Sequence, residues 1–125
     1  AINECLDSTD DAGRCQTYDD EYLSLISCGI TDADIDDLAS CLEAAGPEII
    51  KSLFLSHNNL TTLPEGFFGG LTALEYLYLY SNELTTLPEG IFGGLTALTF
   101  LTLSYNELII LPEGIFGGLK ALEYL

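Results

Sequence analysis

Positive charge is scarce in this sequence. Of its 125 residues only 3 are Lys or Arg, whereas 20 are Asp or Glu, so the formal net charge is −17. A protein this negative repels the phosphate backbone of nucleic acids and the anionic surface of a membrane. We therefore expect no nucleic-acid partner. No apolar run approaches the roughly 18 residues that a membrane-spanning helix needs, so we expect no membrane insertion.

Methionine is also absent, and no basic and then apolar leader precedes Ala1. We therefore expect a processed or partial chain. The low hydrophobicity that marks intrinsic disorder is missing as well, because 48% of the residues are hydrophobic. A chain of this length is sufficient for one domain with a hydrophobic core.

The acidic residues are concentrated in a cap-like first part of the chain. Residues 1–48 hold 13 of the 20 Asp and Glu residues and all four cysteines: Cys5, Cys15, Cys28 and Cys41. Four cysteines in such a segment predict two disulfides and an oxidising compartment. Three connectivities are possible, and we favour Cys5–Cys15 with Cys28–Cys41 because each closes a short local loop. Zinc is disfavoured, since the cysteine spacings lack the close pair of a zinc site.

A 24-residue repeat fills the rest of the chain. Its three copies, which we call units 1, 2 and 3, are Leu53–Tyr76, Leu77–Phe100 and Leu101–Tyr124. Units 1 and 2 match at 17 of 24 positions, and units 2 and 3 match at 16 of 24. A fixed period with near-identical copies predicts a solenoid in which each unit contacts its neighbours.

Each copy carries the same structural residues. Its L-x-L segment, Leu53-Phe54-Leu55 in unit 1, has the spacing of a short strand with alternate side chains buried. An Asn follows at the corner after each strand, where a buried amide can satisfy the backbone groups of a loop. A Pro then fixes the turn on the far side, and a Gly-Gly pair permits backbone conformations closed to other residues. The predicted ladder residues are Asn58, Asn82 and Asn106.

The pattern LxxLxLxxNxLxxLPxxxFxxLxx closely resembles the leucine-rich repeat family over residues 50–125. The unit looks like the extracellular "typical" class, seen in Toll-like receptor ectodomains, lamprey variable lymphocyte receptors and algal surface proteins. The resemblance implies an α/β solenoid, a horseshoe segment with short parallel strands on the concave face and mostly irregular coil on the convex face. It also implies a binding role through the concave face. The cysteines add a disulfide-bearing N-terminal cap to this expectation.

The resemblance extends upstream to a longer, helix-containing repeat. Residues 23–30 fit the strand pattern LxLxxNxL with Cys28 at the Asn position, where the alternative to a disulfide is a buried thiol. A capping-box-like pattern at 31–34 then begins a helix that Gly46-Pro47 ends. The predicted organisation is an acidic cap at 1–22, a helix-containing first repeat at 23–52, and three 24-residue repeats plus the first residue of a fourth at 53–125.

Acidic spacing gives one metal candidate. Asp32, Asp34, Asp36 and Glu43 have the spacing of calcium ligands in an EF-hand loop, but the Gly that such a loop requires is replaced by Asp37. We favour the alternative, the solvated acidic face of a helix start. No metal is therefore expected.

Glutamates also repeat with the unit. Glu65, Glu89 and Glu113 form one predicted column, and Glu83 and Glu107 form another. Like charges then stack at about the 4.8 Å spacing of neighbouring strands. Water and salt screen such exposed carboxylates, and we expect rows of solvated acids.

The sequence offers no catalytic constellation. His57, the single histidine, has no Ser or Cys nucleophile paired with it by a known motif. The Gly-Gly pairs lack the Lys and Ser or Thr of a phosphate-binding loop. We expect no enzymatic activity and no cofactor.

A glycosylation motif follows the first ladder residue. Asn59-Leu60-Thr61 is an N-glycosylation sequon, which makes Asn59 a candidate acceptor. Together with the cysteines, it favours a secreted protein located outside the cell or on its surface.

The copies differ mainly where the strand faces outward. Six of the seven differences between units 1 and 2 fall in the stretch aligned with residues 75–83. Alternation places the outward side chains on the concave face, where aromatic residues predict a binding surface for a protein or a glycan. The alternative is that aromatic residues simply suit strands. The predicted ligand-binding residues are Phe54, His57, Tyr76, Tyr78, Tyr80, Phe100, Tyr105 and Tyr124.

The last unit predicts an open apolar end. The sequence contains only the first residue of a fourth unit, so the core side chains of unit 3 would lack a cover. Either the natural chain continues or another subunit stacks there, which gives the alternative function of a structural subunit in an extracellular assembly. The predicted assembly edge comprises Leu101, Leu103, Leu108, Leu111, Phe116 and Leu119.

Overall fold

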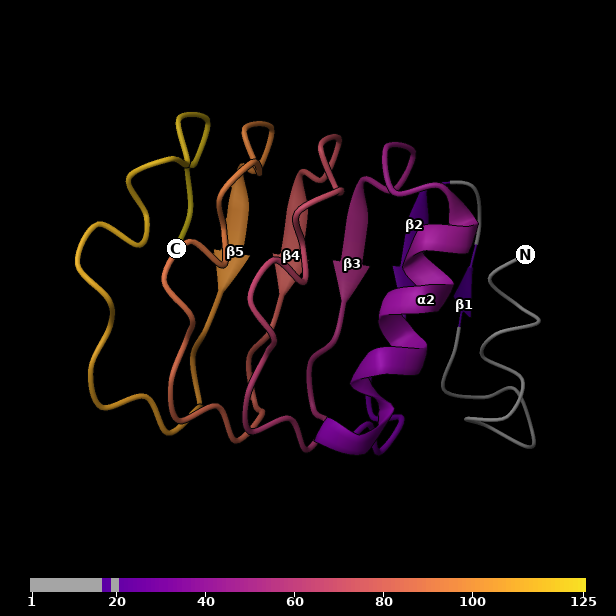
Figure 1. Ribbon diagram of the computed structural model, residues 1–125, viewed down its shortest axis with the longest axis horizontal. Helices are drawn as coiled ribbons and strands as arrows, with labels where there is room; N and C mark the ends of the chain where they lie inside the picture. The colour runs from indigo at the N-terminus through magenta and orange to yellow at the C-terminus, as the bar shows by residue number, and fades with distance from the viewer. Residues whose placement is uncertain (1–16, 19–20) are drawn as a thin grey trace.

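The computed structural model describes residues 17–18 and 21–125, so the predicted Cys5–Cys15 disulfide lies outside the described residues. Figure 1 shows a row of short strands with irregular coil running beside them. The elements in chain order are β1 (Thr17–Tyr18), β2 (Tyr22–Ser24), the 3-10 helix η2 (Asp32–Asp34), α2 (Ile35–Ala45), β3 (Ser52–Phe54), β4 (Tyr76–Tyr78) and β5 (Phe100–Thr102).

The strands form one sheet in the order β1-β2-β3-β4-β5. Strands β2 to β5 are parallel, and their register places Leu23, Leu53, Leu77 and Leu101 in one row across the sheet. Strand β1 pairs antiparallel with β2. The predicted solenoid with parallel strands is therefore confirmed, and the segment predicted as a cap contributes an antiparallel edge strand.

Leucines at the repeating positions build one continuous core, because a single unit cannot bury its apolar side chains alone. Leu53 and Leu77 on the strands and Leu60 and Leu74 in the coil are all fully buried. Both parts of each unit therefore turn leucine side chains toward the same interior.

One phenylalanine from each unit adds an aromatic spine to this core. The ring centroids of Phe68 and Phe92 are 6.4 Å apart, and those of Phe92 and Phe116 are 6.1 Å apart, with interplanar angles of 7° and 14°. Phe68 and Phe92 are buried, whereas Phe116 is half-buried in unit 3. The spine packs coil against coil in a region that has no strand or helix of its own.

The ladder asparagines join each coil to the one before it. The side-chain carbonyl of Asn58 accepts hydrogen bonds from the backbone N–H groups of Cys28 and Ile30, both at 3.0 Å. Its amide donates to the carbonyls of Leu25 and Leu55 at 2.9 Å. Buried backbone groups that have no helix or sheet partner are satisfied in this way.

Units 2 and 3 repeat the arrangement. The side chain of Asn82 accepts from the Leu60 N–H at 3.2 Å and donates to the Leu55 and Leu79 carbonyls. Asn106 accepts from the Leu84 N–H at 3.0 Å. Each ladder side chain therefore bonds both its own unit and the preceding one.

Along the described part of the chain, helical structure is present only in the first repeat, as η2 and α2 (Figure 1). The carboxylate of Asp34 accepts the Thr31 N–H at 2.9 Å, which forms the predicted capping box at the start of η2. The helix ends at Gly46, whose φ of 92° is left-handed. The bounds of the predicted helix are confirmed. Within the described residues, no helix is long and apolar enough to cross a membrane.

The left-handed glycines are mostly not the paired ones. Gly66, Gly90 and Gly114, in the Pro-Glu-Gly turns, have φ between 71° and 76°. Among the Gly-Gly pairs only Gly94 has a positive φ. The prediction that the pairs carry the unusual conformations was therefore wrong for the other paired glycines. Gly69 is needed for space instead, because a Cβ there would lie 3.1 Å from the carbonyl oxygen of Gly66.

Candidate functional site

The outward side chains of β2 to β5 lie together on the face of the sheet that the sequence predicts to be concave, and we call it the concave face. The register aligns Tyr76, Phe100 and Tyr124 in one row across this face and Phe54 and Tyr78 in the next row. On these four described strands, no outward position carries a charged residue. The concave face is therefore a neutral surface on a strongly acidic protein.

Five rings on this face make an unbroken series of contacts, which we call the aromatic row. The centroid distances are 4.9 Å from Tyr22 to Phe54, 4.4 Å from Phe54 to Tyr78, and 5.2 Å from Tyr78 to Phe100. Phe100 and Tyr124 follow at 5.6 Å. The structure thus brings four of the eight predicted ligand-binding residues into the row, and Tyr76 adjoins it at 6.3 Å from Phe100.

Tyr22 belongs to the aromatic row and was not among the predicted binding residues. The prediction ended the cap at residue 22, whereas β2 already begins at Tyr22. The sequence did contain a signal, because Tyr22 stands directly before a strand leucine, Leu23, as Tyr76 stands before Leu77.

The rings at the centre of the row lie face to face. Phe54 and Tyr78 have an interplanar angle of 12°, so each covers a face of the other. In this pair, the ring edges and the Tyr78 hydroxyl are therefore more accessible to a ligand than the ring faces. Burial raises the pKa of the Tyr78 phenol, and the neighbouring phenols of Tyr76 and Tyr80 raise it further. Its hydroxyl therefore remains a hydrogen-bond donor at neutral pH.

Two of the predicted binding residues lie at the rim of the face. His57 and Tyr105 occupy the turn after their strands, with left-handed φ values of 58° and 57°. Such a conformation costs a non-glycine residue about 1 kcal/mol. In both turns it directs the next residue, the ladder Asn, toward the core. His57 meets the ring of Tyr80 edge-on at 5.1 Å, whereas Tyr105 is 83% exposed.

Two of the four calcium candidates, Asp32 and Asp34, make other contacts. The Asp32 carboxylate accepts hydrogen bonds from the Thr61 hydroxyl and from the backbone N–H groups of Thr61 and Thr62 in the next unit. Asp34 caps the helix instead. Among the side chains that the structure describes, no three from His, Cys, Asp or Glu lie close enough to share a metal ion. The spacing of Asp32, Asp34, Asp36 and Glu43 therefore does not correspond to a converging ligand set.

The Asp32 contacts predict a pH-dependent contribution to stability. Hydrogen bonds from Thr61 lower the pKa of Asp32 below its ordinary value of 3.8. A lowered folded-state pKa stabilises the fold above that ordinary value, and the gain is lost as the pH falls through the folded-state pKa. Thermal melts should therefore show a lower melting temperature for Asp32→Asn than for wild type at neutral pH. The difference in melting temperature should disappear in strong acid. Asp36→Asn is the matched control, and a gap independent of pH would contradict the assignment.

Two predictions about modification stay predictions. Asn59 is exposed, and its amide donates to the Glu83 carboxylate at 2.9 Å, so the side chain is accessible at the surface. The Cys28–Cys41 disulfide involves the side chain of Cys41, which lies outside the described side chains.

The predicted assembly edge is only partly open. Leu101 and Leu119 are buried, contrary to the expectation that they would lack a cover. The reason is that Tyr124 pairs with Phe100 and accepts the Leu101 N–H at 3.0 Å, so the last residues already cover this part of the core. Leu103, Leu108 and Phe116 are half-buried, and Leu111 is 41% exposed.

Known proteins share this architecture. Residues 49–108 match the family model for the leucine-rich repeat. The leucine-rich repeat domain of APL1B is 29% identical with a TM-score of 0.73, over 85% of this chain and 30% of that one. A leucine-rich repeat protein from Leptospira interrogans is 38% identical with a TM-score of 0.52, over 58% of this chain and 18% of that one. Among curated proteins, none matches the chain significantly.

The chain spans less than a third of the length of either solved structure. Leucine-rich repeat domains generally mediate protein binding and are typically not enzymes. Residues 49–108 thus match the leucine-rich repeat family, and the solved structures and the parallel strands in register show that the described chain is similar in fold to leucine-rich repeat domains.

Proposed function

We propose that this protein is an extracellular recognition module that binds a polypeptide partner through the aromatic row of its concave face. The observation that carries the proposal is the unbroken series of five rings on a face whose other outward strand positions carry Ser, Thr and one further Tyr, Tyr76. Tyrosine gives a large, rigid contact area with a polar tip, at a low cost in side-chain entropy. An apolar patch on an exposed face is typical of a contact surface.

Ring orientation favours a polypeptide over a glycan. The CH groups of a sugar ring are attracted to the negative face of an aromatic ring. In Phe54 and Tyr78 these faces are turned toward each other at 4.4 Å. Edges and hydroxyls can still pack against aliphatic side chains and donate to backbone carbonyls, which a peptide supplies in every residue.

The extracellular setting is part of the same proposal. It is supported by the four cysteines and by the exposed sequon at Asn59. The net charge of −17 would repel an acidic partner wherever the contact extends beyond the neutral face, so we expect the partner to carry few acidic groups there.

The test replaces Tyr78 of the aromatic row and Tyr80, which follows β4 and contacts the ring of His57. Peptides are selected from a displayed random library on the immobilised protein at about 0.3 M salt, which screens diffuse charge attraction. Their affinities are then measured by fluorescence anisotropy. Tyr78→Ala with Tyr80→Ala should weaken the binding of the selected peptides about a hundredfold, because two half-buried aromatic anchors are lost.

Thr72→Ala with Thr96→Ala, at exposed coil positions, is the matched control and should leave affinity unchanged. Circular dichroism of both double variants should equal that of wild type. Peptides that bind the tyrosine double variant as tightly as wild type would sink the concave-face proposal. Retention on a neutral polysaccharide gel that is lost in the same variant would establish a glycan ligand instead.

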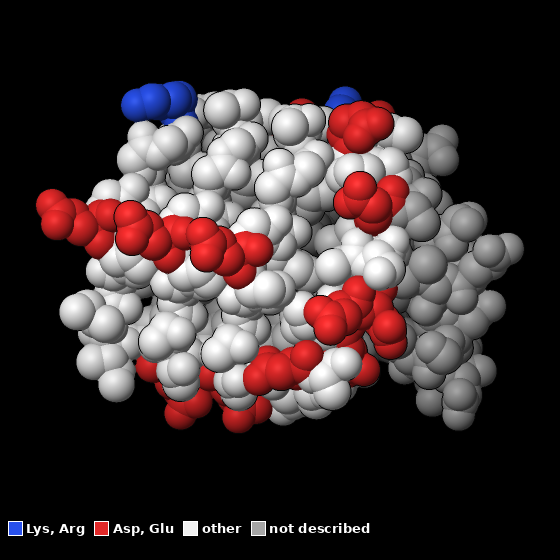
Figure 2. Space-filling view, viewed as in Figure 1, with Lys and Arg blue, Asp and Glu red and all other residues white. Residues whose placement is uncertain are grey.

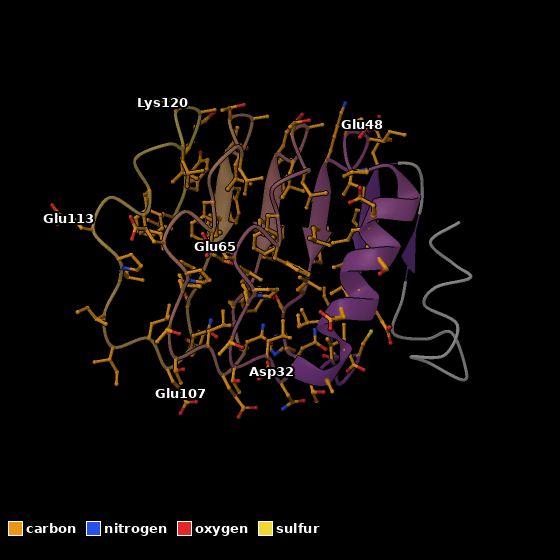
Figure 3. All side chains as sticks on the ribbon, viewed as in Figure 1. Asp32, Glu48, Glu65, Glu107, Glu113 and Lys120 are labelled. Atoms are coloured by element: carbon orange, nitrogen blue, oxygen red, sulfur yellow. The ribbon has the colours of Figure 1, made fainter. Side chains whose placement is uncertain are left out.

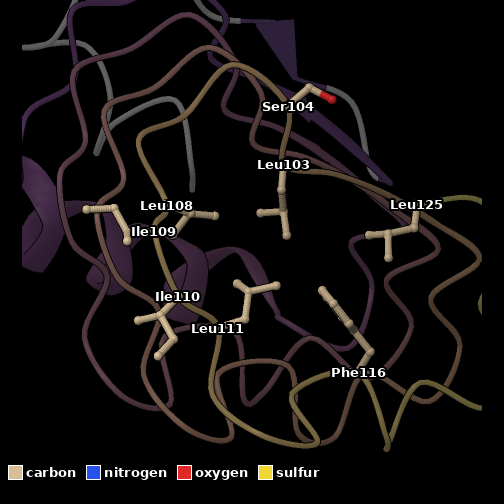
Figure 4. A pocket seen from close by; sticks show the side chains of 8 residues that line it. All are labelled: Leu103, Ser104, Leu108, Ile109, Ile110, Leu111, Phe116 and Leu125. Carbon is tan, nitrogen blue, oxygen red and sulfur yellow. The ribbon is translucent and has the colours of Figure 1, made fainter.

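End-to-end stacking is the second candidate function. Figure 4 shows the exposed end of unit 3, where Leu103, Leu108 and Phe116 line a hollow of about 610 Å³ together with Ile110 and Leu111. Either a further repeat or another subunit would cover the core side chains of this face, Leu103, Leu108 and Phe116. Sedimentation over a concentration series distinguishes the candidates, since stacking predicts an average mass that rises with concentration.

A further inference from the structure

One surface of the solenoid changes character in unit 3. Between the ladder Asn and the Pro, units 1 and 2 carry Thr61-Thr62 and Thr85-Thr86, and unit 3 carries Ile109-Ile110 at the same positions. We call this series the lateral strip. Ile109 is 93% exposed and Ile110 is 74% exposed. Two large β-branched apolar side chains therefore replace two polar ones on an open surface.

The exposure of the pair would persist if another repeat were stacked on unit 3. Thr85 and Thr86 have a stacked unit on both sides and are nevertheless exposed. A further repeat would therefore leave Ile109 and Ile110 uncovered as well. The hollow at the end of unit 3 touches the same residues, but the lateral strip is a separate surface for this reason.

Acidic rows border the strip on both sides. Figure 2 shows one red row from the left edge to about the middle of the molecule, separate red patches along the lower edge, and an uncharged band between them. Figure 3 places Glu65 and Glu113 at the ends of one row, and Glu107 lies across the band from Glu113. Lys120, the one basic residue of unit 3, lies at the top of the same view, at the edge opposite Glu107.

We propose that the lateral strip at Ile109-Ile110 is a second docking site, for a partner segment that carries apolar side chains flanked by Lys or Arg. The apolar pair supplies the area to be buried, and Glu107 and Glu113 supply charge complementary to the flanks. A second copy of this chain is disfavoured as the occupant, because a symmetric contact would bring the acidic rows of both copies together. The site lies outside the aromatic row and does not require it.

The experiment uses a defined probe. A fluorescein-labelled amphipathic peptide of Leu and Lys is titrated with the intact chain at about 0.15 M salt, beside a companion peptide in which Ser replaces Leu. Ile109→Thr with Ile110→Thr restores the Thr pair of units 1 and 2, which those units accommodate. This variant should weaken the Leu-Lys peptide at least about tenfold, since the apolar anchor is lost. The weak, charge-driven binding of the Ser-Lys peptide should not change.

A gain-of-function variant completes the test. Thr85→Ile with Thr86→Ile places a second pair between Glu83 and Glu89 and should raise the number of bound Leu-Lys peptides. Equal affinity of the Leu-Lys peptide for wild type and the Ile109→Thr, Ile110→Thr variant would overturn the proposal. A wild type that dimerises in sedimentation while this variant stays monomeric would also overturn it, because the occupant would then be a second copy.

Discussion

Phe92→Ala is expected to lower the free energy of unfolding by about 3–5 kcal/mol, the range for a fully buried phenylalanine. The ring is 1% exposed and stacks between Phe68 and Phe116. Its removal leaves a cavity in a part of the core that is framed by coil. Urea denaturation followed by circular dichroism measures the loss as a lower midpoint.

Phe116→Ala is the matched control for the spine. The same side chain at the same phase is half-buried in unit 3 and stacks on one neighbour along the described chain. It should therefore destabilise clearly less than Phe92→Ala. A loss in Phe116→Ala equal to that in Phe92→Ala would show that the stacked spine is not what stabilises the coil side.

Asn58→Leu is expected to destabilise by about 4 kcal/mol. The substitution keeps the side-chain volume and removes the acceptor of two backbone N–H groups, those of Cys28 and Ile30. Each hydrogen bond lost by a buried backbone group costs about 1–3 kcal/mol. The hydrogen bond that the Asn58 side-chain amide donates to the Leu25 carbonyl is lost as well. Denaturant titration of wild type and variant gives the difference.

Asn82→Leu offers an internal comparison at the next rung. Asn82 accepts from one backbone N–H, that of Leu60. The carbonyls to which it donates, Leu55 and Leu79, each keep a bond from a neighbouring ladder residue. The expected loss is therefore about 2 kcal/mol. An Asn82→Leu variant less stable than Asn58→Leu would contradict this count of hydrogen bonds.

Much of the fold could be predicted because the same residues return every 24 positions. The L-x-L segments predicted the strands, and the capping box with Gly46 predicted helix α2. The left-handed conformation of Gly66 was missed, because the geometry of the turn, and not the pairing of glycines in the sequence, decides which glycine has a positive φ. The cover at the end of the core was also missed, since Tyr124 forms a parallel bridge with Phe100 and so adds strand pairing after unit 3.

The site could be predicted as a face but not as a set of contacts. Alternation placed Phe54, Tyr76 and Tyr78 on the concave face, yet it says nothing about which rings stack. Alternation also places Ser56 outward, whereas the structure buries it completely and leaves its hydroxyl without a partner in the described part of the chain. The link from Asp32 to Thr61 joins residues 29 apart in different kinds of repeat, which no local pattern encodes.

The direction of the asparagine bonds has a consequence for how such a chain can change in length. Asn82 completes the backbone of unit 1, and Asn106 completes that of unit 2. If a stretch of 24 residues were duplicated, the backbone N–H groups of the inserted unit would be bonded by the ladder Asn of the unit that follows it. The ladder Asn of the inserted unit would in turn bond the unit that precedes it. A duplication of any other length would break this succession at one joint. Growth in whole copies would widen the concave face by one strand at a time, so that genetic duplication, rather than redesign of a strand, can set how long a ligand the protein spans.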